Sequence, residues 1–259
     1  MPVKPVMNQS GLKNEHFSVF KVVLGESMDV VYLVKECPVC EELTYSLRSL
    51  EKNLHHDRVF IVGGCPQNIY KGNVEYYPIR QGHNKYKNTT NNLKIICKEE
   101  KLSEDFILMN DDFFILKPIT EKDLNLCRGP VEDVLKDYKR RFGMNEYIRG
   151  MEQTEIYLKD LGVEKPISYE LHIPLVMNKK NVLKMFELPY IDSLSVIHKR
   201  TIYGNLFCKD SEVVEDVKVI KDRFCPINSD KFLSCDDASW PRVREYVGPL
   251  FPNKSKYEI

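Results

Sequence analysis

The sequence predicts an α/β fold in which a mostly parallel central sheet is flanked by helices. Short apolar runs of strand length alternate along the chain with amphipathic segments of helix length. One of these runs, Phe106–Met109, is apolar at every position, which is typical of a central strand buried on both faces. With 259 residues and 42% hydrophobic content, the chain can bury a sizeable core. We therefore expect one large domain over residues 1–259.

The elements of the first half are predicted from the spacing of apolar residues. β-branched and aromatic residues predict strands before the run at 106–109. Leu43, Leu47 and Leu50 recur at helical spacing and predict a helix over 41–53. Residues 81–92 are almost entirely polar, so we expect a loop there, with a helix beginning near Leu93. The strands preceding the central one are expected at 17–25, 28–36, 56–64 and 73–80.

The second half predicts a helical insertion and a C-terminal extension. Within 130–162, apolar residues recur at helical intervals from Val131, and a second helix through 156–161 ends at Gly162. Near the end of the chain, Ser239 precedes Trp240 and Pro241, a combination typical of a helix start. The Asp236–Asp237 pair before it is expected to cap this closing helix and is the fallback choice for a metal site.

Composition excludes several classes of protein. Lys plus Arg equals Asp plus Glu at 38 each, so no overall field attracts nucleic acid or an acidic membrane. The first residues are too polar for a signal peptide, and no apolar run reaches the roughly 18 to 20 residues of a membrane span. Eight scattered cysteines are typical of reduced thiols. These features predict a soluble cytoplasmic protein without stable membrane insertion.

Asn110, Asp111 and Asp112 follow the central strand directly, and we expect the chemistry there. Ligands of open α/β sheets bind at the carboxyl ends of the strands. Two adjacent carboxylates at that edge repel each other unless a cation or hydrogen-bond donors compensate them. Mg²⁺ or Mn²⁺ would do so, because these ions bind one or two carboxylates and complete their shell with water and phosphate oxygens. The alternative is a structural turn between two strands.

Several segments together resemble the Stealth-type sugar transferases. That family has an early Asp-Val-Val-Tyr strand, a Glu-Leu-x-Tyr-Ser-Leu-Arg-Ser helix, an Ile-Val strand, an Asn-Asp-Asp-Phe-Phe segment and a later His-x-Pro segment. The family usually continues the first strand with Thr-Trp-Val-Asp-Gly, whereas this chain has LVKECP. The matching segments here, in order, are DVVYLV at 29–34, ELTYSLRSLEKN at 42–53, RVFIVGG at 58–64, NDDFFILKP at 110–118 and ELHIPLVMNKK at 170–180.

The resemblance implies a GT-A-like fold, a nucleotide-diphosphate sugar as donor and a short, stand-alone relative of bacterial or phage type. In GT-A enzymes the final carboxylate of a degenerate Asp-x-Asp motif binds the metal, which here makes Asp112 the metal ligand. Asp111 would then contact a sugar hydroxyl or the water shell of the metal. His172, in the segment that resembles His-x-Pro, is predicted to complete the metal site, and Glu170 is the candidate general base.

Further polar residues beside the expected ligand edge are candidates for binding the donor. Residues 17–120 would form the nucleotide-sugar half, and residues 121–259 the acceptor half with the C-terminal extension. A solvated surface is the alternative explanation for each polar segment. The candidate binding residues are Arg80, Lys87, Asn92, His198, Lys199 and Arg200.

The resulting functional hypothesis is a metal-dependent glycosyltransferase with a hydroxyl acceptor, by default on a carbohydrate or cell-surface glycan. One alternative is transfer of a hexose 1-phosphate, which would release a nucleoside monophosphate. Another is glycosylation of hydroxymethylated bases in phage DNA, with the cations at 137–141 and 198–200 contacting phosphates. The last is a binding module for sugar nucleotides that does not catalyse transfer.

Overall fold

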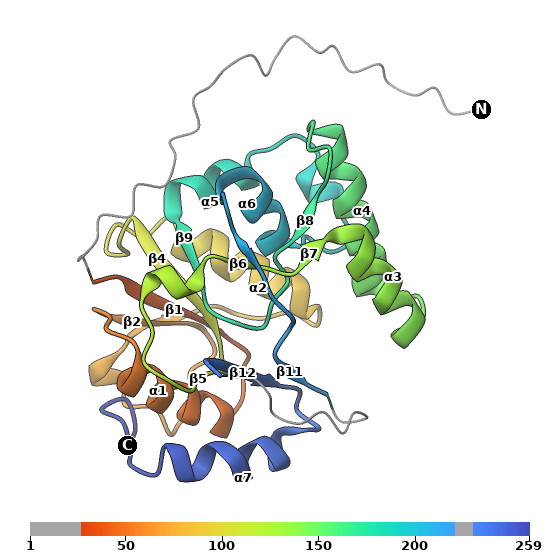
Figure 1. Ribbon diagram of the computed structural model, residues 1–259. Helices are drawn as coiled ribbons and strands as arrows, with labels where there is room; N and C mark the ends of the chain where they lie inside the picture. Colours follow the sequence, from red (N-terminus) through yellow and green to blue (C-terminus); the bar gives the residue numbers. More distant parts are fainter. Residues whose placement is uncertain (1–26, 221–229) are drawn as a thin grey trace.

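The computed structural model describes residues 27–220 and 230–259, and the strand expected at 17–25 lies outside them. The central sheet has the strand order β3-β2-β1-β4-β9, in which β1 to β4 run parallel and β9 is antiparallel to β4. The α/β fold with a mostly parallel sheet is therefore confirmed (Figure 1). The strands are β1 (Asp29–Val34), β2 (Val59–Gly63), β3 (Glu75–Pro78), β4 (Asp105–Asn110) and β9 (Leu175–Asn178).

The register brings the carboxyl ends of the parallel strands to a common edge. Gly63, the last residue of β2, is paired with Val34 of β1 and Pro78 of β3, and Asn110 of β4 is paired with Leu33. Because β9 is antiparallel, its first residue, not its last, lies near this edge. The loop that precedes β9 and contains His172 therefore returns to the edge at which the parallel strands end.

Helices cover both faces of the sheet. Alternate residues of β1 point to opposite faces. Tyr32 packs with Leu47 of α1, and Val31 packs on the other side with Leu93 of α2. In the view of Figure 1, α1 and α7 lie below the sheet and α5 and α6 above it. The helices are α1 (Glu41–Asn53), α2 (Lys85–Ile96), α5 (Lys179–Phe186), α6 (Lys199–Phe207) and α7 (Trp240–Leu250).

A smaller sheet with the order β11-β12-β5 joins the turn after β4 to the end of the chain. Strand β12 is antiparallel to β5 and parallel to β11. Phe114 of β5 stacks on Trp240 of α7, with ring centroids 5.8 Å apart. The C-terminal extension thereby holds the segment that follows Asp112. The strands are β5 (Phe113–Ile115), β11 (Lys218–Val219) and β12 (Phe232–Cys235).

The predicted helical insertion is present as α3 and α4, which pack on each other through a small apolar cluster that includes Val134 and Met151. Among the described residues, no helix is both long and apolar enough to cross a membrane. The remaining elements are α3 (Val131–Phe142), α4 (Glu146–Asp160), β6 (Leu126–Cys127), β7 (Gly129–Pro130), β8 (Ile167–Ser168), β10 (Glu212–Val213) and the 3-10 turns Lys71–Asn73, Glu121–Leu124 and Ile191–Ser193.

The expectation of a loop over 81–92 is wrong for most of its length, because α2 begins at Lys85. The cap explains the early start. The side chain of Asn84 accepts hydrogen bonds from the N–H groups of Tyr86 and Lys87, which have no partner within the helix. Polar residues then occupy the first turns of the helix because these turns border the ligand edge and not the core.

Candidate functional site

Two cavities lie at the edge where the parallel strands end, one beside β3, β2 and β1 and one beside the turn after β4. Asn110 ends β4, and Asp111 and Asp112 lead into β5. A cavity of about 500 Å³ lies beyond the ends of β1, β2 and β3, and another of about 570 Å³ extends from Asn110 to the helical insertion. A metal site and a structural turn between two strands were the alternative expectations for this segment; the structure has the turn, and the metal site stays a prediction.

Asp112 has one carboxylate oxygen that the protein satisfies and one that it does not. Oδ2 lies 3.2 Å from Lys218 Nζ and accepts a hydrogen bond from Ser234 Oγ at 3.3 Å. Oδ1 is buried and has no hydrogen-bond partner among the described residues. A buried acceptor without a partner is costly. The described chain therefore leaves this oxygen without a hydrogen-bond donor.

Asp111 is in an environment that disfavours its negative charge. Burial, and after it the charge of Asp112, raise its pKa to about 7, although Lys35 acts in the opposite direction. Cys40 Sγ lies 3.8 Å from Asp111 Oδ2 and donates to it. Burial raises the pKa of Cys40 well above its ordinary value, so the thiol stays protonated. The pair of carboxylates thus has more negative charge than its surroundings compensate.

These residues fit a divalent cation that is held partly by substrate. Among residues 27–220 and 230–259, no group of three or more His, Cys, Asp and Glu side chains is placed to hold a metal alone. Mg²⁺ and similar ions need only one or two carboxylates when water and phosphate oxygens complete the shell. The partnerless Oδ1 of Asp112 and the raised pKa of Asp111 match that requirement.

His172 is held in place by a carboxylate from the segment before β11. Asp216 Oδ1 accepts from the main-chain N–H of His172 at 3.0 Å, and Oδ2 lies 2.8 Å from the ring Nδ1. The ring also meets Phe113 edge-on, at 6.1 Å between centroids. Because Phe113 directly follows Asp112, the histidine lies beside the turn. Its role as a metal ligand stays a prediction.

Glu170 forms a buried network with the start of α6. Its Oε1 accepts from the N–H of Thr201 at 3.2 Å and lies 3.7 Å from His198 Nδ1. Burial would raise its pKa, but the interaction with His198 and the charges of Lys199 and Arg200 outweigh burial and bring it to about 2. The carboxylate is therefore ionised at neutral pH and weakly basic.

The three residues 198–200 do not form one exposed cationic patch. His198 is buried, and its Nε2 bonds the carbonyl of Tyr147. The guanidinium of Arg200 is also buried and donates to the carbonyls of Leu171 and Ile173. Lys199 instead lines the cavity of about 570 Å³, where its Nζ donates to Thr89 Oγ1 at 3.0 Å.

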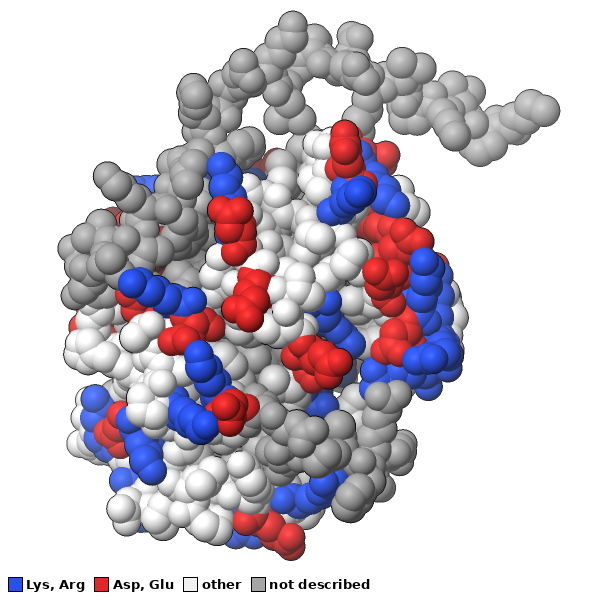
Figure 2. Space-filling model, viewed as in Figure 1, with Lys and Arg blue, Asp and Glu red and all other residues white. Residues whose placement is uncertain are grey.

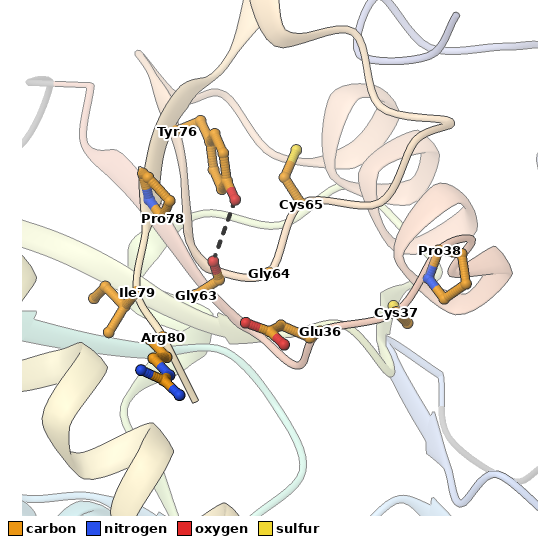
Figure 3. A pocket seen from close by; sticks show the side chains of 10 residues that line it. All are labelled: Glu36, Cys37, Pro38, Gly63, Gly64, Cys65, Tyr76, Pro78, Ile79 and Arg80. Atoms are coloured by element: carbon orange, nitrogen blue, oxygen red, sulfur yellow. Dashed lines mark hydrogen bonds between the residues drawn. The ribbon is translucent and has the colours of Figure 1, made fainter. Parts of the chain in front are cut away.

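The other predicted binding residues lie at different places. Arg80 lines the cavity of about 500 Å³ (Figure 3). Asn92 is buried beneath the end of β2 and donates to the carbonyl of Val62 at 3.3 Å. Lys87 is exposed on α2 and belongs to neither of these two cavities. The fallback pair is structural at Asp236, whose carboxylate accepts from the N–H of Ser239 at 2.8 Å.

Sequence reasoning missed the residues that the segment 212–220 and β12 bring to the site, namely Asp216, Lys218 and Ser234. A signal for two of them was present. Asp216 and Lys218 alternate with Val217 and Val219, and residues two apart in an extended segment share a face. The sequence therefore contained a polar face opposite an apolar one. Nothing in the pattern indicated that this face would meet Asp112.

No family model matches the chain, and no curated protein matches it in sequence. Similar solved structures include the galactosyltransferase LgtC in complex with donor and acceptor sugar analogs, with 11% identity, a TM-score of 0.48 and coverage of 88% of this chain and 97% of that one. The bifunctional glycosyltransferase WbbM in its apo structure has 11% identity, a TM-score of 0.43 and coverage of 79% and 42%. An active-site mutant of LgtC has 12% identity, a TM-score of 0.42 and coverage of 85% and 83%. Similarity at this level is too low to transfer a function to this chain.

Proposed function

We propose that the protein is a metal-dependent glycosyltransferase with a GT-A-like fold that moves a sugar from a nucleotide-diphosphate donor to a hydroxyl acceptor, by default on a carbohydrate. The observation that supports this most is the buried, partnerless Oδ1 of Asp112 at the carboxyl end of β4. The proposal assigns one cavity to each substrate, the cavity of about 500 Å³ to the donor and that of about 570 Å³ beside Asn110 to the acceptor. Residues 17–120 supply the donor side and residues 121–259 the acceptor side and C-terminal extension.

The nucleotide is assigned to the cavity of about 500 Å³. Gly63 and Gly64 line it, and a Cβ at either position would collide with the main chain of Val34 or Lys35, so close packing of the strand ends requires both glycines. Figure 3 shows the hydroxyl of Tyr76 directed at the Gly63 carbonyl. Glu36, which follows β1, and Arg80, which follows β3, also line the cavity. Glu36 is suited to ribose hydroxyls and Arg80 to a phosphate oxygen.

The leaving diphosphate is assigned to the turn after β4. A divalent cation there would be held by Asp112, with Asp111 and His172 beside it, and would supply positive charge to the departing diphosphate. Lys218 adds a fixed positive charge next to Asp112, because β11 and β12 hold it in place. Preorganised charge of this kind stabilises a developing anion without reorganisation.

The acceptor is assigned to the cavity of about 570 Å³, which Glu170 and His172 both line. Glu170 stays our candidate for taking the proton of the acceptor hydroxyl. Its pKa of about 2 keeps it ionised over the whole neutral range, at the cost of low basicity. Exchanging it for glutamine is expected to reduce transfer while leaving donor binding intact.

Transfer to DNA is the weaker alternative, because the cations assigned to it on α3 are paired within the chain. Arg140 and Arg141 both contact Asp137, at 2.8 and 2.7 Å, and Lys139 pairs with Glu152. Figure 2 shows acidic and basic side chains interspersed over α3 and α4 on the face in view. This surface offers no excess of positive charge to a phosphate backbone.

A thermal-shift screen of nucleotide sugars, with Mn²⁺ and with a chelator, tests the proposal. A ligand that binds only the folded state raises the melting temperature. We expect one nucleotide class to raise it in the presence of Mn²⁺ and much less with the chelator. If no nucleotide sugar changes the melting temperature under either condition, the proposal is wrong. Release of hexose from the same donors without acceptor would separate an enzyme from a binding module.

A further inference from the structure

The cavity of about 570 Å³ is the meeting point of three helix starts. Lys85 is the first residue of α2, Glu146 the first of α4 and Lys199 the first of α6, and all three line the cavity. The N-terminus of a helix has a partial positive charge. The cavity therefore receives three positive helix ends in addition to its side chains.

Lysine is an unfavourable choice at the first position of a helix, because its charge meets the positive end of the helix dipole. Two of the three helices nevertheless begin with one, Lys85 and Lys199. Neither forms an ion pair with a carboxylate among residues 27–220 and 230–259. Lys85 Nζ lies 5.3 Å from the ring centroid of Tyr86, and Lys199 Nζ donates to the hydroxyl of Thr89. Helix stability does not explain these two lysines, whereas a negatively charged ligand does.

Burial disfavours the charge of Lys199, and the nearby carboxylate of Glu170 compensates it only in part. Burial lowers the pKa of Lys199 to about 8, with Glu170 and Arg200 acting in opposite directions. The carboxylate of Glu170 is already engaged by the N–H of Thr201 and by His198. An anion placed beside Nζ would restore the charge that burial disfavours.

Aromatic side chains also line the cavity, and most of them come from the helical insertion. Tyr138 and Phe142 of α3 contact each other edge-on, with centroids 5.5 Å apart, and Tyr147 of α4 lies 6.2 Å from Tyr138. Tyr86 of α2 closes the row at 6.0 Å from Tyr147. Rings with a polar edge, together with a few fixed polar groups, suit a ligand that is part apolar and part hydroxylated, as a sugar ring is.

Lys199 does not contact the carboxylate at the proposed diphosphate site. Lys218 is the lysine that contacts Asp112, at 3.2 Å, whereas Lys199 reaches across to Thr89 on α2. Four cationic side chains and two carboxylates line the cavity as a whole, namely Lys85, Lys199, Arg200 and Lys218 with Glu146 and Glu170.

We infer that this cavity binds a sugar that carries a negatively charged group, with the ring against Tyr138 and Tyr147 and the anion beside Lys199 and Lys85. The ligand is thus an acidic sugar, carrying either a carboxylate or a phosphate, and not a neutral one. This inference rests on the proposed sugar transfer for the statement that the ligand is the acceptor. Binding of an acidic sugar to the cavity does not depend on it.

The test compares matched monosaccharides by ligand-observed NMR titration. The probes are glucose, glucuronic acid and glucose 6-phosphate. The affinity of the parent protein for each sugar is measured alone and again in the presence of saturating nucleoside diphosphates and Mn²⁺. We expect at least one of the two acidic sugars to bind roughly 10-fold more tightly than glucose, since a hydrogen bond to a charged group is stronger than a neutral one. Which of the two binds more tightly distinguishes a carboxylate from a phosphate.

Substitutions identify the cavity. Lys199→Met should abolish the preference for the acidic sugar over glucose, while Lys199→Arg should retain part of the preference. Lys98→Met is the matched control, because Lys98 is exposed and follows the end of α2. This variant should bind all three sugars as the parent protein does. If Lys199→Met fails to fold, Lys85→Met at an exposed position should give a smaller loss in the same direction.

Two results would overturn the inference. The first is equal affinity for acidic and neutral sugars in the parent protein. The second is a combined result: nucleoside diphosphates displace the acidic sugar, and Lys199→Met loses as much affinity for the nucleotide as for the acidic sugar. That pattern would assign Lys199 to the donor. Absence of sugar transfer with an intact acidic-sugar preference would contradict the proposed function alone.

Discussion

Asp216 holds His172 at two points, accepting hydrogen bonds from its main-chain N–H at 3.0 Å and from its ring Nδ1 at 2.8 Å. Burial would raise the pKa of Asp216, but its interactions with His172 and Arg128 hold the pKa well below its ordinary value. An ionised acceptor at Nδ1 favours the tautomer in which Nε2 keeps its lone pair. Histidines that bind metals are commonly oriented by a carboxylate in this way.

We therefore predict that His172→Gln and Asp216→Ala both weaken Mn²⁺ binding, the second by roughly 10- to 100-fold, as is typical when a carboxylate behind a ligating histidine is removed. Titration of free Mn²⁺ by electron paramagnetic resonance measures this without any turnover. His83→Gln, at an exposed position outside the site, is the control. Parental Mn²⁺ affinity in both variants would mean that His172 is structural and that another residue closes the metal site.

Asp112→Asn is predicted to abolish metal-dependent turnover of donor, because the amide removes the negative charge next to the partnerless oxygen. We expect a loss of at least about 100-fold, in line with the removal of a group that stabilises the transition state electrostatically. Donor consumption with and without Mn²⁺ measures it. Asp237→Asn is the matched control, since that carboxylate is 86% exposed and pairs with Lys35. Unchanged Mn²⁺ dependence in Asp112→Asn would contradict the assignment.

Asp111→Asn is predicted to stabilise the metal-free protein at neutral and alkaline pH. The pKa of Asp111 in the folded state is about 7, above its ordinary value near 4, so the unfolded chain loses this proton first as pH rises. The free energy of unfolding therefore falls between about pH 4 and pH 7 and stays lower above pH 7.

Because asparagine cannot ionise, Asp111→Asn should gain up to about 4 kcal/mol at pH 8, at about 1.4 kcal/mol per pKa unit, and almost nothing near pH 4. Urea unfolding at both pH values, with a chelator present, measures the difference. A gain of the same size at both pH values, or no gain at pH 8, would show that ionisation of Asp111 does not cost stability in the folded state.

Gly63→Ala is predicted to destabilise the fold by roughly 1 to 3 kcal/mol. Gly63 has φ +108°, and a Cβ there would lie 2.4 Å from the carbonyl oxygen of Val34 in the neighbouring strand. Gly82→Ala serves as the control, because its φ is ordinary and its nearest neighbour would be 3.8 Å away. Thermal unfolding of both variants measures the difference. Equal melting temperatures would mean that the end of β2 can relax without cost.

The central strand and α1 could be predicted from the sequence because local patterns determine them. The apolar run at 106–109 is a strand buried along its length, and the leucines of α1 bury one face of a helix. Burial of either kind leaves a pattern of apolar residues that can be recognised in the sequence. The start of α2 was missed because polar residues that face the ligand edge have no such period. Only the cap at Asn84 indicated where the helix begins.

The position of Asp112 could be predicted, but its partners could not. Asp112 follows β4 directly, whereas Lys218 and Ser234 reach it only through the pairing of β11, β12 and β5. That pairing joins segments more than 100 residues apart in the chain. No local pattern specifies which short strands will pair across such a distance, so the environment of the site had to come from the structure.

The most direct test of the proposed activity is the identity of the nucleotide released from a sugar nucleotide in the presence of Mn²⁺, determined by ion-exchange chromatography and mass spectrometry. The proposal predicts a nucleoside diphosphate, formed in parallel with transfer of the sugar, stopped by a chelator and lost in Asp112→Asn. Release of a nucleoside monophosphate would instead identify transfer of a sugar phosphate. If no donor is consumed, or if release is unchanged when the metal is removed, the account of Asp112 as the centre of a metal-dependent glycosyltransferase is contradicted.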